Sequence, residues 1–553
     1  MQIVNRLHFQ NLRGDLLGGI TAAIVALPLA LAFGVSSGAG AIAGLYGAIF
    51  VGFFAALCGG TPSQISGPTG PMTVIMTAVF SSLIAENPDS GLEMAFTVVM
   101  LGGIFQILFG ILKLGKYIVL MPYAVISGFM SGIGVIIIFI QIGPFFGHPG
   151  TANVIESVSK IPYFINNLNP DVTTLGIITL IILFLAPRRI TAFVPSPLLA
   201  LLIGTLVSIF FLPVPESNLI GEIPTGLPTP HLPVFSLEQM KTMLVNGLML
   251  GILGAIDSLL TSLVADNITH TNHDSDRELI GQGIGNLVSG MFGGLPGAGA
   301  TMRTVINVHA GGRTPLSGIT HSIILLFILL WAAKFTEVIP QAILAGILLK
   351  VGIDIIDWGF LKRAHKLSLK ATGIMYSVLL LTVFVDLITA VAIGVFISNL
   401  LTVQRLSDMQ IDEVKSIVEP HDEAPLSDEE KELLEKAGGR LLLLHLSGPM
   451  SFGAAKAISG QMGMVDKYDV LILDLSDVSY LGITASLALE NMMKEARQKH
   501  REVFLIGASG SVKVRLGKLD IWNFLPQRNQ VATRMEALEK ALIVLDGNIA
   551  LSK

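Results

Sequence analysis

The sequence predicts an α-helical membrane protein with fourteen transmembrane segments, arranged as two inverted repeats of seven, followed by an α/β domain outside the bilayer. Three observations lead to this fold class. The 553 residues are 52% hydrophobic and only 14% charged, with a mean hydropathy of +0.71, whereas a soluble protein carries roughly 25% charged residues. Apolar segments long enough to cross a bilayer recur from Asp15 to Gln404. Beyond Arg405, strand and helix patterns alternate as they do in a soluble domain.

The expected membrane segments lie near residues 15–36, 41–59, 68–85, 93–112, 121–145, 173–187, 195–213, 242–265, 276–293, 301–310, 315–333, 338–356, 369–385 and 387–404. Lys and Arg residues support this count, because they concentrate in the loops that would be cytoplasmic if the N-terminus is cytoplasmic. The outer loops then hold only Lys160, Lys241 and Lys334. We therefore expect a multi-pass protein of the plasma (inner) membrane with both termini in the cytoplasm.

The composition also limits the function. A net charge of −5 gives no sign of a nucleic-acid partner. The single cysteine, Cys58, excludes an intrachain disulfide and a site built from several cysteines. The N-terminus lacks a cleavable signal pattern, so the first segment is expected to be retained. The Gly-rich stretches lack the Lys-Ser/Thr of a phosphate-binding loop, and no catalytic grouping of Ser, His and Asp is apparent, so we expect neither an enzyme nor ATP-driven chemistry.

Three domains are expected: a transmembrane domain over 1–405, an acidic helical linker over 406–438 and a cytoplasmic α/β domain over 439–553. Within the linker, Ser427 to Glu430 has the pattern of a helix capping box. The α/β domain is predicted to contain buried parallel strands at Leu441–Leu446, Val470–Leu473 and Val503–Ile506, with an amphipathic helix at Ala485–Lys499.

Two membrane segments are interrupted at their start by glycine and proline, and they are the third of each set of seven. Residues 66–71 read Ser-Gly-Pro-Thr-Gly-Pro, and residues 296–301 read Pro-Gly-Ala-Gly-Ala-Thr. Both breaks lead into the tripeptide Thr-Val-Ile, at Thr73 and at Thr304. An odd number of segments per repeat gives the halves opposite topology, and inverted repeats with broken helices are a transporter design. The alternative is that these residues only kink two helices.

The two breaks predict an anion site. Helix N-termini carry partial positive charge and free N–H groups, which attract anions. The amides expected here belong to Thr69, Gly70, Met72, Ala300, Thr301 and Met302. The hydroxyls of Thr69 and Thr301 add donors, and the small residues Gly70 and Ala300 allow close approach of the backbone. The threonines could instead bond back to their own helices. Arg303 either attracts the anion or serves a structural role.

Asp257 predicts a cation site beside the anion. It is a charged residue in the otherwise uncharged stretch Leu248–Val264, and an intramembrane carboxylate is a functional-site hypothesis by default. Thr261 lies one turn later on the same helix face. With oxygen atoms of the second break, at Gly299, Ala300 and Thr301, these groups would form an oxygen-rich sodium site. The alternatives are a structural carboxylate and a proton carrier.

Two other polar groups have plain interpretations. Glu278, at the start of a predicted helix, is expected to act as an N-terminal charge rather than as a ligand. The run His270-Thr271-Asn272-His273-Asp274 has loose spacing and no cysteine, so we expect a solvated loop there rather than a metal site.

Several motifs resemble those of the SulP anion transporters. They are the stretch from Gly281 to Leu287, the stretch Gly293–Gly297, the stretch Arg303–Asn307, and Ser66–Pro71. Asp474-Leu475-Ser476-Asp477-Val478 is similar to the STAS domain appended to that family. The resemblance implies a mobile core domain, a static gate domain, elevator-like transport, and homodimers held through the STAS domain. Within the family the chain is most similar to sodium-dependent bicarbonate symporters, which implies bicarbonate and sodium as the transported ions and no cofactor.

The sequence departs from the family pattern at two places. Leu29 follows Pro28 where the family usually has Gln, which removes a polar contact to substrate. In the STAS domain, Gly482-Ile483-Thr484-Ala485 replaces Asp-Ser-Ser-Gly, so the phosphorylatable position is Thr484 without its acidic neighbour. A sulfate or dicarboxylate transporter, driven by protons or sodium, is the alternative function. Another alternative is an uncoupled exchanger or channel, although a pure anion path needs no carboxylate such as Asp257. A membrane sensor is a further alternative, although no output module for a sensor is evident.

Overall fold

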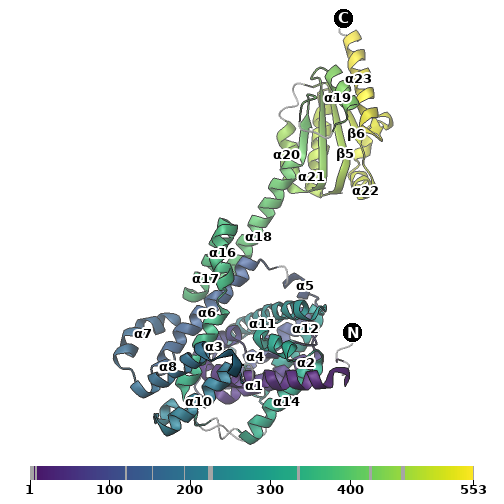
Figure 1. Ribbon diagram of the computed structural model, residues 1–553. Coiled ribbons are helices and arrows are strands. Elements are labelled where there is room, and N and C mark those ends of the chain that lie inside the picture. Colours follow the sequence, from purple (N-terminus) through teal and green to yellow (C-terminus); the bar gives the residue numbers. More distant parts are fainter. Residues whose placement is uncertain are drawn as a thin grey trace. The chain divides into compact units, whose positions relative to one another are not determined.

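The computed structural model describes residues 5, 9–118, 121–151, 153–191, 194–221, 228–332, 337–385, 387–422, 426–462 and 468–551. Lys334, used above to orient the chain, lies outside these residues. The chain divides into two compact units, Met1–Ser398 and Asn399–Lys553. The first is built from helices, and the second contains the five-stranded sheet (Figure 1).

Each expected membrane segment contains one main helix. The first seven are α1 (Leu12–Ser37), α2 (Ala41–Cys58), α3 (Gly70–Glu86), α4 (Gly91–Ile111), α6 (Tyr123–Phe145), α8 (Pro170–Leu185) and α10 (Ser196–Phe210). The second seven are α11 (Met240–Thr269), α12 (Ser275–Met291), α13 (Thr301–His309), α14 (Pro315–Ala332), α15 (Gln341–Ile355), α17 (Leu369–Phe384) and α18 (Leu387–Asp412). The short helices α5 (Gly115–Ile118), α7 (Val154–Asn166), α9 (Arg188–Thr191) and α16 (Trp358–Leu367) lie between them.

The helices differ in length for a physical reason. Among the described residues, six are long and apolar enough to cross a membrane alone, and α7 with α8, bent by 114°, would make a seventh. The half-helices α3 and α13 begin only after the glycine- and proline-containing breaks, which leaves 17 and 9 residues respectively. Neighbouring elements bury most of α3 and four of the nine residues of α13.

Contacts between helices define two groups. The core group consists of α1–α4 and α11–α14, and the gate group consists of α6, α8, α10, α15 and α17. Small residues permit the close crossings within each group. A Cβ at Gly103 of α4 would lie 2.5 Å from the carbonyl oxygen of Gly283 on α12, and one at Gly134 of α6 would lie 2.5 Å from that of Gly352 on α15. The groups meet where α1 contacts α10 and α15, and where α3 contacts α6.

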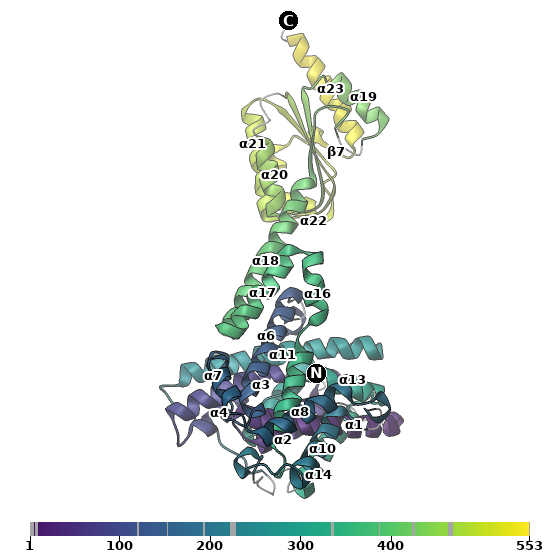
Figure 2. The same cartoon turned by 60° about the vertical axis from the view of Figure 1, so that its left-hand side comes forward.

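The second unit has one sheet with strand order β3-β4-β5-β6-β7. Its strands are β3 (Val414–Ile417), β4 (Leu441–Met450), β5 (Val470–Leu481), β6 (Glu502–Ile506) and β7 (Gln530–Val531). Only β3 is antiparallel to its neighbour. The helices α20 (Phe452–Met462), α21 (Ile483–Gln498) and α22 (Gly510–Lys518) cover one face, and α19 (Asp428–Lys436) and α23 (Arg534–Leu551) cover the other (Figure 2). The predicted parallel strands and amphipathic helix are confirmed.

The region expected to be a helical linker is more varied than predicted. The helix α18 continues to Asp412, and then Val414–Ile417 forms the edge strand β3 instead of a helix. Val414 and Ile417 are buried against the two faces of the sheet, and this tertiary packing overrides local helical propensity. The capping box is confirmed, because Ser427 Oγ accepts from the N–H of Glu430 while the Glu430 carboxylate accepts from the N–H of Ser427.

A buried polar cluster joins the elements of the second unit. Asp474 of β5 is fully buried and accepts hydrogen bonds from His445 of β4 at 3.0 Å and from Arg534 of α23 at 2.9 Å. Arg534 also pairs with Glu430 of α19 at 3.4 Å. Burial raises the pKa of Asp474, but hydrogen bonds from His445, Ser476 and Arg534 outweigh it and hold that pKa well below its usual range. The cluster fixes α19 and α23 against one face of the sheet.

Candidate functional site

The two breaks in the membrane helices lie against each other. Ser66–Gly67, labelled β1, pairs in antiparallel fashion with Ala298–Gly299, labelled β2. Directly after these residues, α3 begins at Gly70 and α13 begins at Thr301. Two half-helices from opposite halves of the chain therefore start at the same place, and the first-turn N–H groups of each have no partner within the helix.

A cavity of about 290 Å³ lies at this crossing. Its described lining is Leu29, Phe33, Pro68, Thr69, Gly70, Pro71, Met130, Asp257, Gly299, Ala300, Thr301, Met302, Arg303, Val351, Asp354 and Ile355. The structure thus brings together all five residues predicted for the anion, namely Thr69, Gly70, Ala300, Thr301 and Arg303. Of the residues predicted for sodium, Thr261 alone is absent from this lining, and it is hydrogen-bonded to two residues that belong to it.

One predicted donor is wrong. The N–H of Ala300 donates to the carbonyl oxygen of Ile65 at 2.8 Å, so it is not free for an anion. The pairing of the two breaks extends to Ala300, and a paired strand uses its amides in the ladder. Likewise, the N–H of Gly299 donates to Ser258 Oγ at 3.1 Å. What Ala300 offers the cavity is a small side chain, while the free amides begin with the first turn of α13.

The two site threonines do not bond back to their own helices. Thr301 Oγ1 lies 2.7 Å from Thr261 Oγ1 of α11. Thr69 Oγ1 is buried and makes no hydrogen bond of normal geometry among the described residues, but its side chain interacts with the carboxylate of Asp257. Thr73, one turn later on α3, does bond back, to the carbonyl oxygen of Thr69 at 2.8 Å. The Thr69 hydroxyl and the Asp257 carboxylate therefore form an incompletely satisfied polar pair in the cavity wall, which a bound ion would complete.

Asp257 shares the cavity with oxygen-bearing residues of the second break, Gly299 and Thr301. Thr261 Oγ1, one turn further along α11, donates to the carbonyl oxygen of Gly299 at 2.9 Å and contacts Thr301 Oγ1. Asp257 Oδ2 is buried without a hydrogen-bond partner in the described chain. Among the described residues, no group of three or more His, Cys, Asp and Glu residues is arranged so that it could hold a metal ion. This set of one carboxylate with hydroxyls and a carbonyl has the oxygen ligands that hard cations prefer.

Arg303 combines the two roles that the sequence left open. Its guanidinium Nη2 donates to the carbonyl oxygen of Pro68 at 2.5 Å, so it ties the first break to the second half-helix. The side chain is only 3% exposed and lines the cavity. Its charge interacts with that of Asp257. Arg303 therefore places one positive charge beside both half-helix ends.

Sequence reasoning missed most of the residues that hold the breaks in shape. Asn286 of α12 accepts from the N–H of Gly297 at 2.7 Å and donates to the carbonyl oxygen of the same residue at 2.9 Å. Thr304 Oγ1 accepts from the N–H of Ile65 at 3.0 Å. Ser258 holds Gly299, as described above. The sequence signal that could have identified these residues is a polar side chain in a membrane helix, placed on the helix face that points toward a break.

Glu278 follows its predicted structural interpretation. Its carboxylate accepts from the N–H groups of Gly60 and Thr61, both at 2.9 Å, and from the side-chain amides of Gln64 and Gln282. The three bonds from Gly60, Thr61 and Gln64 join the start of α12 to the loop before the first break, and the bond from Gln282 lies within α12. The His270–Asp274 stretch caps the end of α11, with His273 Nδ1 at 2.6 Å from Asp266 Oδ2.

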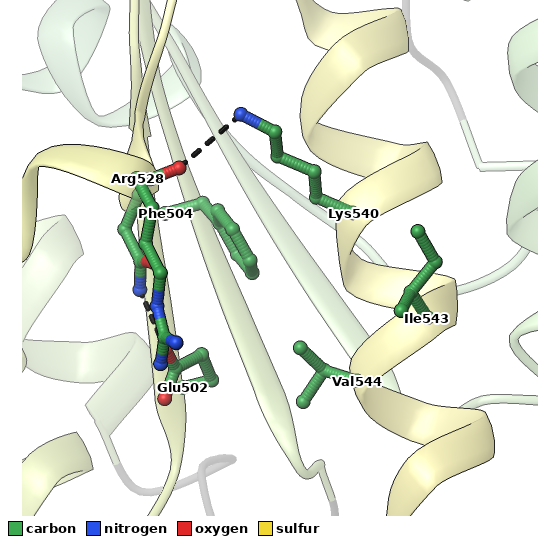
Figure 3. Close-up of a pocket in the computed structure, with 7 residues that line it drawn as sticks. Glu502, Phe504, Arg528, Lys540, Ile543 and Val544 are labelled. Carbon is green, nitrogen blue, oxygen red and sulfur yellow. Dashed lines mark hydrogen bonds and ion pairs between the residues drawn. The ribbon is translucent and has the colours of Figure 1, made fainter.

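A second cavity of about 310 Å³ lies in the second unit, between β6 and α23 (Figure 3). Its lining is Glu502, Phe504, Arg528, Asn529, Lys540, Ile543 and Val544. The polar groups here bond to one another: Arg528 pairs with Glu502 at 3.3 Å, and Lys540 Nζ donates to the carbonyl oxygen of Arg528 at 3.3 Å (Figure 3). The first cavity, with its unpartnered groups, is therefore the stronger candidate for a substrate site.

Two sets of membrane helices with crossed half-helices and a charged cavity at the crossing define a secondary transporter. The chain belongs to the sulfate permease family, whose model matches residues 12–378, and a STAS domain model matches residues 434–533.

The chain is similar to two curated bicarbonate transporters named BicA. It is 55% identical to that of Synechocystis sp. over 99% of this chain and 97% of the relative, and 51% identical to that of Picosynechococcus sp. over 100% and 98%. The solved transmembrane domain of a cyanobacterial BicA matches with a TM-score of 0.67 at 56% identity, covering 70% of this chain and all of that one. The structure of SLC26A9 matches with a TM-score of 0.82 over 99% of this chain at 18% identity, which shows the shared fold.

Proposed function

We propose that this protein is a sodium-dependent bicarbonate symporter that takes bicarbonate into the cell. The observation that carries the proposal is a single cavity lined both by two half-helix N-termini and by the oxygen atoms around Asp257. The names of the relatives that are 55% and 51% identical over nearly their full length support bicarbonate as the anion. The alternatives are a sulfate or dicarboxylate transporter and an uncoupled exchanger.

The adjacency of the two predicted ion sites supports coupling. Thr301 belongs to both, since its amide starts α13 and its hydroxyl contacts Thr261. A sodium ion at Asp257 would neutralise the carboxylate that otherwise repels an anion in the same cavity. Each ion then raises the affinity of the site for the other, and such coupling is reciprocal.

The lining of the cavity supports an elevator-like movement. One wall comes from the core group and carries the breaks, Asp257 and Arg303. The opposite wall contains Met130 of α6 together with Val351 and Ile355 of α15, all from the gate group. Three of the four described gate-group residues that line the cavity are apolar, so this wall makes few directional bonds to the core group, and the core group with its ions can slide along it. Alternating access in inverted-repeat transporters commonly works through such movement of one bundle against another.

Uptake by purified protein in liposomes tests the proposal. With an inward sodium gradient, radiolabelled bicarbonate is expected to accumulate, and replacing sodium with choline should reduce its initial rate at least about tenfold. Radiolabelled sulfate should accumulate slowly under both conditions. Sodium-independent uptake of bicarbonate, or sulfate uptake at a comparable rate, would contradict the symporter and favour one of the alternatives.

The second unit is proposed to face the cytoplasm from the plasma membrane and to hold two protomers together. A chain truncated before Val414 keeps α18 and loses the whole sheet, whose strands begin at β3. We expect this chain to insert into the membrane but to dimerise poorly, with transport reduced and with the same anion preference. Light scattering in detergent beside the uptake assay checks this, with the full-length chain as control. A truncated chain that remains a stable dimer with full activity would place the dimer contact in the membrane domain.

A further inference from the structure

One charged residue stands out on the gate side of the cavity. Every other described lining residue from the gate group is apolar, namely Met130, Val351 and Ile355, whereas Asp354 of α15 carries a carboxylate. The helix α15 contains a single other charged residue, Lys350, one turn earlier. Charged residues inside membrane helices are costly and mark ion pathways by default. Neither residue has a place in the anion or sodium site described above.

Asp354 and Lys350 form a close ion pair. Lys350 Nζ donates to both carboxylate oxygens, at 2.5 and 2.6 Å. The side chain of Asp354 is 33% exposed and that of Lys350 is 24% exposed, so the pair is partly shielded from water. Lys350 Nζ also lies 5.2 Å from the centre of the Phe184 ring on α8, a contact within the gate group. These contacts hold the ammonium group to one side of the carboxylate.

The pair presents unequal charges to the cavity. Asp354 lines the cavity, while Lys350 is not among the described residues that line it. An anion in the cavity is therefore closer to the negative end of the pair than to the positive end. Coulomb repulsion is proportional to the charge of the anion, so a dianion is repelled twice as strongly as a monoanion at the same place. The wall formed by the core group counteracts this repulsion, because Arg303 and the half-helix N-termini attract the anion. Asp257 lines the same wall and adds a negative charge to it.

We propose that Asp354, held by Lys350, selects by charge between monovalent and divalent anions and so excludes sulfate and other dianions from the site. This inference rests on the proposed function, because it names the residue that discriminates bicarbonate from sulfate. Sulfate is the relevant competitor, since a 30% identical relative, YvdB of Bacillus subtilis, bears the name putative sulfate transporter.

Competition in proteoliposomes tests the role of Asp354. The full-length protein takes up radiolabelled bicarbonate under a sodium gradient while unlabelled sulfate is added in increasing amounts. For Asp354→Asn we expect the ratio of the sulfate inhibition constant to the bicarbonate KM to fall at least about tenfold. Lys350→Gln should shift the ratio in the opposite direction, because it leaves the carboxylate without its counter-charge. Glu156→Gln, which breaks the exposed pair with Lys160 on α7, serves as the matched control and should leave the ratio unchanged.

An exchanged pair separates selection from folding. Lys350→Asp combined with Asp354→Lys keeps an ion pair on α15 and turns the ammonium toward the cavity, so sulfate should compete more strongly than in Asp354→Asn. If wild-type protein takes up bicarbonate but Asp354→Asn and the exchanged pair both keep the wild-type ratio, the charge-selection inference is wrong and the symporter proposal stands. If wild-type protein takes up no bicarbonate, the proposed function itself fails. The inference would also be overturned if, for the wild-type protein, the sulfate inhibition constant equalled the bicarbonate KM.

Discussion

Replacing Asp257 with Asn is expected to reduce sodium-driven bicarbonate uptake at least about tenfold, or ~1.4 kcal/mol. The substitution keeps the size of the side chain and removes its charge. Asp257 Oδ2 makes no hydrogen bond of normal geometry among the described residues, and the hydroxyl of Thr69, which interacts with this carboxylate, can donate to the side-chain oxygen of Asn as well. What is lost is the negative charge that would hold sodium beside Thr261 and the Gly299 carbonyl. The measurement is initial uptake at several sodium concentrations, and the apparent sodium affinity should fall with the rate.

The alternatives for Asp257 give different results in the same assay. A purely structural carboxylate would lower the amount of folded protein, seen by size-exclusion chromatography, and leave the sodium dependence of the remainder unchanged. A proton carrier would make uptake depend on a pH gradient instead of sodium. Asp266→Asn is the matched control, because Asp266 lies on the same helix and pairs with His273 outside the cavity. If Asp257→Asn keeps nearly wild-type uptake and unchanged sodium dependence, the assignment of the sodium site to Asp257 is wrong.

Replacing Gly70 or Ala300 with Leu is expected to reduce bicarbonate uptake at least about a hundredfold, which corresponds to ~2.7 kcal/mol. A Cβ at Gly70 would already lie 2.8 Å from Ile355 Cδ1 and 2.9 Å from Ile137 Cδ1, both on gate-group helices. A leucine side chain at either position enters the cavity of about 290 Å³ between the half-helix ends and the gate wall. It therefore occupies the place of the anion and obstructs sliding of the core group.

The matched control is the same substitution at Gly373 of α17, where a Cβ would meet no atom within 4 Å. Gly373→Leu should retain wild-type uptake, and all three variants should elute as folded protein in detergent. Binding of bicarbonate measured by calorimetry separates a blocked site from a blocked movement, since Ala300→Leu should lose binding itself. If Ala300→Leu transports normally, the anion passes elsewhere and the proposed geometry is wrong.

Much of the architecture was predictable because its causes are local. A membrane helix needs a continuous apolar stretch of sufficient length, so each of the expected segments contains a helix. The breaks before Gly70 and Thr301 followed from glycine and proline at equivalent places in both halves. Asp257 and Thr261 were predicted to share a helix face from their spacing alone, and both now lie at the second break. The Ser427 capping box was predictable for the same reason, since its partners are three residues apart.

The sequence by itself therefore determined the helices, the two breaks and the residue types that surround them. Only the tertiary structure decided which polar atoms remain free. The Ala300 amide bonds to Ile65, and Arg303 bonds to Pro68, because the breaks pair across more than 200 residues of chain. The same holds for Asp354: a charge in an apolar helix is visible in the sequence, but the face of α15 that lines the cavity is set by packing against α6 and α8. Periodicity places residues on a helix face, and only contacts between distant helices decide what that face meets.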